Sequence, residues 1–130
     1  MRTDKQIKGA LGEDAVCAEL ERRGHRILAR NYRRRSGEID IISETGEYIV
    51  FTEVKARKAG SMVSGLEAVD FAKKKKIIMT ADSYLTENPC DLYVRYDIAE
   101  VRLTKGAVPQ VTRVDIYEGA FDTEGIYTIN

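Results

Sequence analysis

Two stretches of the chain decide its fold: Glu38–Ser43, which reads EIDIIS, and Tyr48–Lys55, which reads YIVFTEVK. Both are short and rich in β-branched and aromatic residues, and a turn around Thr45 and Gly46 separates them, so they predict a β-hairpin. Apolar residues alternate onto both sides of each expected strand. Strands of this kind lie in a sheet that is covered on both faces. We therefore expect helices on both sides of this hairpin.

The segments that flank the hairpin supply those helices and further strands. Thr3 and Gln6 form a capping box followed by apolar residues at helical spacing, which predicts a helix from about Asp4 to Arg23. A second capping box, Ser64–Glu67, predicts a helix that runs to about Thr86. Strands are expected at residues 26–32 and 92–101, with a weaker signal at 111–117. The order α-β-β-β-α-β predicts an α/β fold with a mixed sheet flanked by helices.

The composition fits one compact domain. The chain has 130 residues, of which 43% are hydrophobic, enough for one core and too few for two. We expect a single domain over residues 1–130, with a core at about 4–103 and a C-terminal extension at 104–130. Lys plus Arg and Asp plus Glu both number 21, so the net charge is zero. The overall charge therefore gives no evidence for a histone-like polybasic binder, and any attraction to nucleic acid must come from where the charges lie.

Cysteines, the histidine and hydropathy restrict the remaining classes. Cys17 and Cys90 lie far apart, and the start of the chain lacks the apolar stretch of a signal peptide, so we expect free thiols in a cytoplasmic protein. No apolar run is long enough for a membrane span. His25 is the single histidine, which excludes a multi-histidine zinc site. We expect it on the surface and assign it no role.

Charged residues inside the apolar hairpin are the feature that points to chemistry. Glu38, Asp40, Glu53 and Lys55 occupy the expected strands, and buried charge is costly unless it is paired or coordinates a metal. With a two-residue loop at Gly46–Glu47, or a four-residue loop at 45–48, Asp40 lies opposite Glu53. With a two-residue loop at 45–46, Glu38 takes that place. All three loops put Asp40, Glu53 and Lys55 on one face of the sheet. A loop one residue longer or shorter, without a bulge, would place them on opposite faces.

Two interpretations remain for this group of charged residues. Two carboxylates at such a short distance repel each other unless a cation lies between them, and Mg²⁺ or Mn²⁺ with oxygen ligands suits the space between them. Lys55 then orients or deprotonates a water, or stabilises charge on a phosphate. The alternative is an inter-strand salt bridge of Lys55 with Glu53 or Asp40. Three carboxylates and a lysine among isoleucines and valines favour the metal site.

Further candidates come from the two expected helices and from basic runs. Glu13 borders the buried face of the first helix, and Gly9 and Gly12 let that helix approach another element closely. Lys73 lies near the apolar face of the second helix. The basic residues expected to hold a nucleic-acid backbone, in a salt-dependent way, are Arg33, Arg34, Arg35, Arg57, Lys73 and Lys74.

Several motifs together resemble a known family. They are Gly9-x-x-Gly12-Glu13, Asn31-Tyr32-Arg33, Gly37-Glu38-Ile39-Asp40, Phe51-Thr52-Glu53-Val54-Lys55-Ala56-Arg57 and Glu67-Ala68-Val69. Over about residues 9–101 the chain resembles the bacterial YraN-like family, which is similar to archaeal Holliday-junction resolvases within the restriction-endonuclease-like nuclease superfamily. The resemblance implies an α-β-β-β-α-β core. It also implies that Asp40 and Glu53 are metal ligands, Lys55 the catalytic lysine and Glu13 the helix-borne carboxylate. Lys73 would be the polar helix residue above the active centre.

Three hypotheses follow. The first is a metal-dependent endonuclease acting on DNA that is branched or otherwise structured, with Mg²⁺ or Mn²⁺ on Asp40, Glu53 and Glu13 and on the backbone carbonyl of Val54. The second is a nucleic-acid-binding module without turnover, completed by a protein partner. The third is a structural or protein-interaction domain whose carboxylates pair with Lys55. A homodimer with two active centres follows only from the analogy with junction resolvases.

Overall fold

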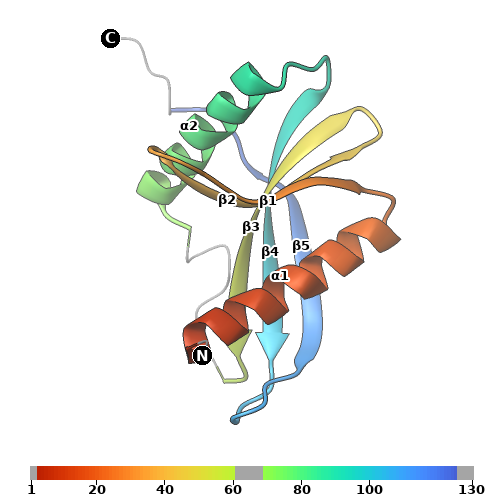
Figure 1. Cartoon of the computed structure of the whole chain (residues 1–130), viewed down its shortest axis with the longest axis vertical. Coiled ribbons are helices and arrows are strands. Elements are labelled where there is room, and N and C mark those ends of the chain that lie inside the picture. The colour runs from red at the N-terminus through yellow and green to blue at the C-terminus, as the bar shows by residue number, and fades with distance from the viewer. Residues whose placement is uncertain (1–2, 61–68, 126–130) are drawn as a thin grey trace.

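The chain folds into a five-stranded sheet with two helices packed against it (Figure 1). This computed structural model describes residues 3–60 and 69–125. Its elements are α1 (Asp4–Arg22), β1 (Arg26–Arg34), β2 (Gly37–Thr45), β3 (Tyr48–Lys58), α2 (Phe71–Glu87), β4 (Tyr93–Leu103) and β5 (Val111–Phe121). The α/β fold class and the element order expected from the sequence are confirmed.

The five strands lie side by side in chain order. β3 and β4 are parallel and are joined through α2, while the other neighbouring strands are antiparallel. β3 is therefore the central strand. Two apolar clusters cover the sheet, one built around α1 and the other around α2. Ile41 packs in the α1 cluster and its neighbour Ile42 in the α2 cluster, which confirms that the hairpin is covered on both faces.

The first helix forms as its capping signals predict. Thr3 accepts a hydrogen bond from the Gln6 N–H, and the Gln6 side chain accepts one from the Thr3 N–H. The helix ends at Arg22, one residue before the expected end. Val16 and Leu20 are fully buried and anchor it on the sheet.

The second helix begins later than the sequence predicts. Asp70 has extended backbone angles, φ −82° and ψ 179°, and its side chain accepts a hydrogen bond from the Lys73 N–H. An unbroken helix from Ser64 is therefore wrong, because it would have to pass through this N-cap. The capping box Ser64–Glu67 lies outside the described residues. The C-terminal end is confirmed, since the helix stops at Glu87 before Asn88.

The register of the hairpin places the edge at which the candidate residues gather. The loop is Gly46–Glu47, one of the three expected alternatives, and the β2–β3 ladder runs from the pair Thr45–Tyr48 to the pair Ile41–Thr52. The β3–β4 ladder continues much further, to the pair Lys58–Leu103. The first part of β2, from Gly37 to Asp40, is therefore not paired with β3, and the last part of β3 has an open edge on that side.

The C-terminal segment and His25 add to the core. β5 pairs with β4 from Val111 to Phe121 and is longer than the weak sequence signal predicts. His25 is buried with its Nδ1 atom 2.9 Å from Ser43 Oγ, so the expected surface position is wrong. In the described ranges neither helix is long and apolar enough to cross a membrane.

Candidate active site

Asp40 lies where β2 leaves β3. Its Oδ2 atom accepts a hydrogen bond of 2.8 Å from the Val54 N–H. A regular antiparallel ladder would give that N–H to the main chain of β2. The Asp40 side chain thus replaces a ladder partner and ties the diverging strand to β3. The N–H and C=O of one strand residue point to the same side, so the Val54 carbonyl is also directed toward β2.

Glu53 is the most buried of the candidate carboxylates. Only 4% of the residue is exposed. Its Oε1 atom lies 3.5 Å from the Lys55 Nζ atom and 3.3 Å from the Lys73 Nζ atom of α2. The expected position of Lys73, above the sheet and directed at the carboxylates, is confirmed. Two lysines from two elements therefore compensate one buried charge.

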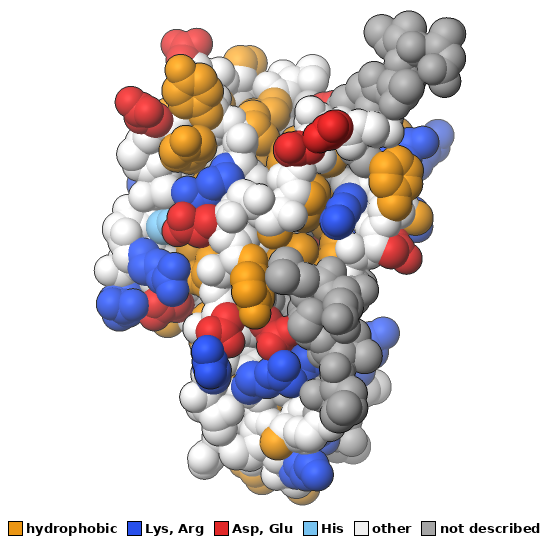
Figure 2. All heavy atoms as spheres, turned by 180° about the vertical axis from the view of Figure 1, so that it is seen from behind, with side chains coloured by type: hydrophobic (Ala, Val, Ile, Leu, Met, Phe, Trp, Pro, Cys, Tyr) orange, Lys and Arg blue, Asp and Glu red, His pale blue; other side chains and the backbone are white. Residues whose placement is uncertain are grey.

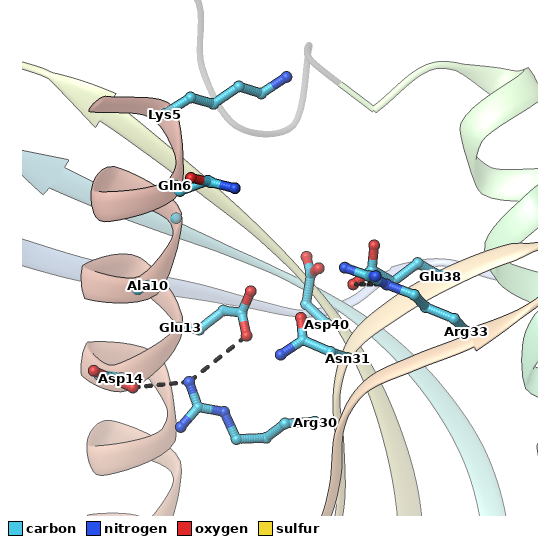
Figure 3. A pocket seen from close by; sticks show the side chains of 11 residues that line it. Lys5, Gln6, Ala10, Glu13, Asp14, Arg30, Asn31, Arg33, Glu38 and Asp40 are labelled. Carbon is cyan, nitrogen blue, oxygen red and sulfur yellow. Dashed lines mark hydrogen bonds and ion pairs between the residues drawn. The ribbon is translucent and has the colours of Figure 1, made fainter. Parts of the chain in front are cut away.

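Glu13 and Asp40 line a common cleft of about 710 Å³ between α1 and the β1–β2 hairpin (Figure 3). The Glu13 carboxylate projects from α1 into this cleft, and its Oε1 atom lies 3.6 Å from the Arg30 Nη2 atom. Arg30 also binds Asp14 at 2.8 Å. The cleft therefore brings a helix-borne carboxylate to the same space as Asp40, which in turn is bonded to the Val54 N–H of β3.

Gly12 sets the distance between α1 and the sheet. A Cβ atom at this position would come within 3.3 Å of the Ala56 Cβ atom and 3.4 Å of a Val54 methyl group. This confirms the close approach expected of Gly12, whose neighbour Glu13 lines the cleft. Gly9 differs, because a Cβ atom there would meet nothing within 4 Å. Gly9 instead lines the cleft.

The carboxylates of the site affect each other's protonation. Burial raises the pKa of Asp40 to about 8; the charge of Glu53 adds to the rise and the Val54 N–H opposes it. Burial also raises the pKa of Glu13, against the hydrogen bond of Asn31 and the charge of Arg30. The ionised form of Asp40 therefore lacks a compensating positive charge among the described residues around it.

The geometry limits which groups could bind a metal together. Within residues 3–60 and 69–125, no three His, Cys, Asp or Glu side chains stand close enough to hold an ion. Asp40 and Glu53 remain as a pair, because the charge of Glu53 acts on the carboxyl of Asp40. Two carboxylates suffice for Mg²⁺, which keeps several waters and takes substrate oxygens as further ligands.

Asn31 belongs to the site and received no role from the sequence. It lines the same cleft, and its side chain lies between those of Glu13 and Asp40 in Figure 3. Its φ of 52° makes it the one residue other than glycine with a positive φ in the described part of the chain. An asparagine inside an expected strand gives no sign of such a backbone, so only its place in the Asn31-Tyr32-Arg33 motif could have drawn attention to it.

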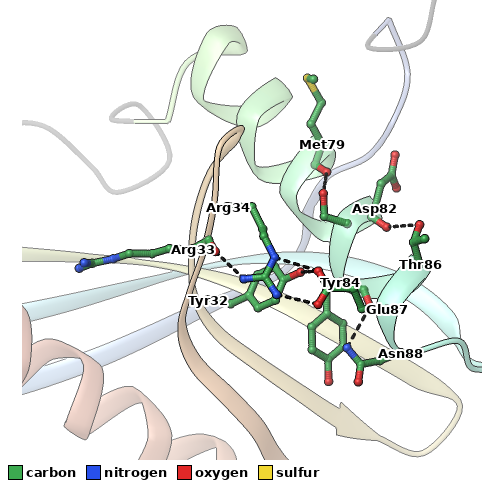
Figure 4. Close-up of polar contacts among 10 residues, drawn as sticks. Tyr32, Arg33, Arg34, Met79, Asp82, Tyr84, Thr86, Glu87 and Asn88 are labelled. Carbon is green, nitrogen blue, oxygen red and sulfur yellow. Dashed lines mark hydrogen bonds and ion pairs between the residues drawn. The ribbon is translucent and has the colours of Figure 1, made fainter.

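The basic residues expected to bind nucleic acid are scattered, and acids pair with several of them. Arg34 stacks on the Tyr32 ring at 4.1 Å and binds Glu87 through two nitrogen atoms (Figure 4). Arg33 lies 3.3 Å from Glu38 on the rim of the cleft. Arg35 is exposed in the β1–β2 turn.

The three remaining basic candidates lie on β3 and α2. The Nε atom of Arg57 is buried and has no hydrogen-bond partner among the described residues. Lys73 binds Glu53, and Lys74 lies 5.8 Å from the Phe121 ring. On the face in Figure 2, basic and acidic side chains are intermixed rather than gathered into a continuous basic surface.

Comparison with known proteins gives consistent matches. The model of the family described as "Uncharacterised protein family UPF0102" matches residues 12–101. A UPF0102 protein of Desulforapulum autotrophicum is 42% identical over 95% of this chain and 100% of its own. One from Acetivibrio thermocellus is 39% identical over 92% of this chain and 95% of its own, and one from Pseudomonas aeruginosa is 32% identical over 93% and 97%. The matched region contains Glu13, Asp40, Glu53 and Lys55.

Proposed function

The chain belongs to the UPF0102 family, as its YraN-like motifs predicted, and we propose that it is a metal-dependent nuclease that hydrolyses phosphodiester bonds in DNA. The observation that carries this proposal is the pair Asp40 and Glu53 at the open edge of β3, with Lys55 beside it. The charge of Glu53 helps to raise the pKa of Asp40 to about 8. A fold keeps such a repulsive pair where a cation or a charged substrate compensates it.

The residues present fit a hard divalent cation. Asp40 and Glu53 would hold Mg²⁺ or Mn²⁺, the Val54 carbonyl is directed toward the same side, and Glu13 stands across the cleft. When bound, the ion would act as a Lewis acid toward a phosphoryl oxygen and would lower the pKa of a water. Water and phosphate oxygens would complete its ligand set.

The two lysines supply the positive charge that phosphodiester hydrolysis needs. Lys55 is half-buried and holds its ammonium group 3.5 Å from Glu53 Oε1. From there it donates hydrogen bonds to a water or to a phosphate oxygen whose negative charge grows during the reaction. Lys73 reaches the same carboxylate from α2 and fixes its orientation. The similarity to junction resolvases favours branched DNA as the substrate.

One observation favours a second candidate, a nucleic-acid-binding or structural domain without turnover. Glu53 already has two lysine partners, and Arg33 and Arg34 are paired with Glu38 and Glu87. In this alternative the carboxylates and lysines only neutralise one another. It predicts that divalent metals leave the stability of the protein unchanged, whereas an ion bound only by the native state must raise it.

Two assays decide between these functions. The first is cleavage of labelled four-way junctions, flaps, single-stranded DNA and RNA with Mg²⁺ or Mn²⁺. We expect Asp40→Asn and Lys55→Met to lower the cleavage rate by about 10²-fold or more. Lys58→Met changes an exposed lysine on the same strand and should cleave like the wild type.

The second assay is thermal melting with EDTA, Mg²⁺ or Mn²⁺. A metal at 100 times its Kd should stabilise the wild-type protein by about 2.7 kcal/mol and leave Asp40→Asn unaffected. Equal cleavage by wild type and both variants would identify a contaminating nuclease and overturn the proposal. Salt-sensitive DNA binding with neither cleavage nor metal stabilisation would establish the second candidate.

A further inference from the structure

The backbone of Asn31 departs from strand geometry in β1, in a part of the strand that follows the register shift between Ile27 and Ala29. In the β1–β2 ladder Arg30 pairs with Ile41 and Tyr32 with Ile39, so Asn31 and Asp40 stand opposite each other between those two pairs. Asn31 has φ 52°, in the left-handed region. The residue opposite the central carboxylate thus departs from strand geometry, and its side chain enters the cleft (Figure 3).

This conformation has a cost that another residue would reduce. The left-handed region costs an L-residue about 1–2 kcal/mol, and glycine adopts it freely. The other positive-φ residues in the described ranges are all glycines, namely Gly24, Gly37, Gly46, Gly60, Gly106, Gly119 and Gly125. If the backbone alone mattered at position 31, glycine would serve there too. Asparagine tolerates this region better than most other residues, so a use beyond the backbone must be sought in the surroundings of its side chain.

That use is visible in the contacts of Glu13. The Asn31 side chain lies beside the Glu13 carboxylate in the cleft (Figure 3) and opposes the rise in the pKa of Glu13 that burial causes, while Arg30 approaches the same carboxylate at 3.6 Å and binds Asp14 more closely, at 2.8 Å. An amide N–H is a neutral donor, so it can orient a carboxylate without cancelling its charge. Arg30, by contrast, neutralises the carboxylates that it binds.

We propose that Asn31 is a positioning residue whose amide holds the Glu13 carboxylate toward Asp40, and that the left-handed backbone at position 31 places this amide between them. This inference rests on the proposed function, in which Glu13 faces a divalent ion on Asp40 and Glu53 from across the cleft. Groups that orient metal ligands in this way change metal affinity by about 10- to 100-fold when they are removed.

The test compares Asn31→Gly with the wild-type protein by Mn²⁺ titration calorimetry and by urea unfolding in EDTA. Glycine keeps the backbone conformation and removes the amide. We expect the metal-free variant to be at least as stable as the wild type, and its Mn²⁺ affinity to fall by about 10-fold or more. If Asn31 had only a structural role, the stability of the metal-free protein and the Mn²⁺ affinity would fall together.

A double-mutant cycle shows whether Asn31 acts through Glu13. In a Glu13→Gln background, Asn31→Gly should cause no further loss of Mn²⁺ affinity. Unchanged Mn²⁺ affinity of Asn31→Gly, with a loss in Glu13→Gln, would overturn the role of Asn31 and leave the proposed function intact. Equal, additive losses would show that Asn31 acts independently of Glu13 and would also overturn it. No Mn²⁺ binding by the wild type would overturn the proposed function and this inference together.

Discussion

Asp40 meets two opposing demands at the scale of a single residue. Its carboxylate accepts the Val54 N–H and so secures the point where β2 leaves β3. The same carboxylate stands in a site where burial and the charge of Glu53 disfavour its ionised form. The structural task needs only an oxygen acceptor, whereas metal binding needs the charge. Substitution by asparagine separates the two, because it keeps the acceptor and removes the charge.

The stability of the metal-free protein should therefore depend on pH through Asp40. The pKa of Asp40 is about 8 in the folded protein against an ordinary value of 3.8, so between these values the folded state binds more protons than the unfolded state. Stability then falls as the pH rises from about 4 through about 8. We expect Asp40→Asn to match the wild type near pH 4 and to exceed it at pH 8 by a free energy of unfolding on the order of 5 kcal/mol.

Urea unfolding in EDTA at several pH values between 4 and 8.5 measures this difference. Asp14→Asn removes a negative charge from the same cleft, at an exposed residue bound to Arg30, and controls for the change in net charge. A difference between Asp40→Asn and wild type that stays constant with pH would contradict the expectation. So would a destabilised Asp40→Asn at pH 8.

At the scale of elements, the sequence predicts the strands and the capped start of α1 better than the site's fine geometry. Period two places Glu53 and Lys55 on one side of β3, but three hairpin loops satisfied the pattern, and only the structure selects Gly46–Glu47. Gly46 has φ 53°, which suits the tight turn.

The role of Asn31 depends on a contact between β1 and α1, and no local pattern encodes such a contact. The start of α2 was missed because Ser64–Glu67 carries the stronger capping signal, whereas Asp70 forms the observed cap.

The approach of α1 to β3 can be tested with two glycines of the same helix. Gly9→Ala adds a methyl group in open space and should stabilise the protein by about 0.5–1 kcal/mol, through helix propensity. Gly12→Ala would place its methyl group 3.3 Å from the Ala56 Cβ atom, on a strand held by β4. We expect overpacking to cancel the propensity gain and to leave this variant about 1 kcal/mol or more below Gly9→Ala.

Chemical denaturation of both variants in EDTA gives these free energies, and Mn²⁺ titration shows whether Glu13 has moved. Gly9→Ala should bind Mn²⁺ like the wild type, while Gly12→Ala should bind it more weakly because α1 carries Glu13 away from Asp40. Equal stabilisation by the two substitutions would show that the short distance between α1 and β3 does not depend on a glycine at position 12.

At the scale of the whole molecule, several basic side chains are paired with acidic side chains within the structure. Arg33, Arg34 and Lys73 are bound by Glu38, Glu87 and Glu53, so half of the basic residues nominated for nucleic-acid binding are already compensated. Arg35, Arg57 and Lys74 are the other three. A protein of this kind should hold a phosphodiester backbone through few contacts, and its specificity should come from the site.

The salt dependence of DNA binding tests this distribution of charge. With about three phosphate contacts, we expect the plot of log K against log salt concentration to have a slope of about −3. Glu87→Gln releases Arg34 from its bidentate partner. One additional contact should then make the slope steeper by about 1.

Fluorescence anisotropy with a labelled four-way junction in EDTA, from 50 to 300 mM NaCl, measures both slopes. Glu47→Gln, at an exposed position in the β2–β3 turn, should leave the slope unchanged. A wild-type slope near zero would show that phosphates are not bound, and one beyond about −6 would show that the internal ion pairs open to bind DNA.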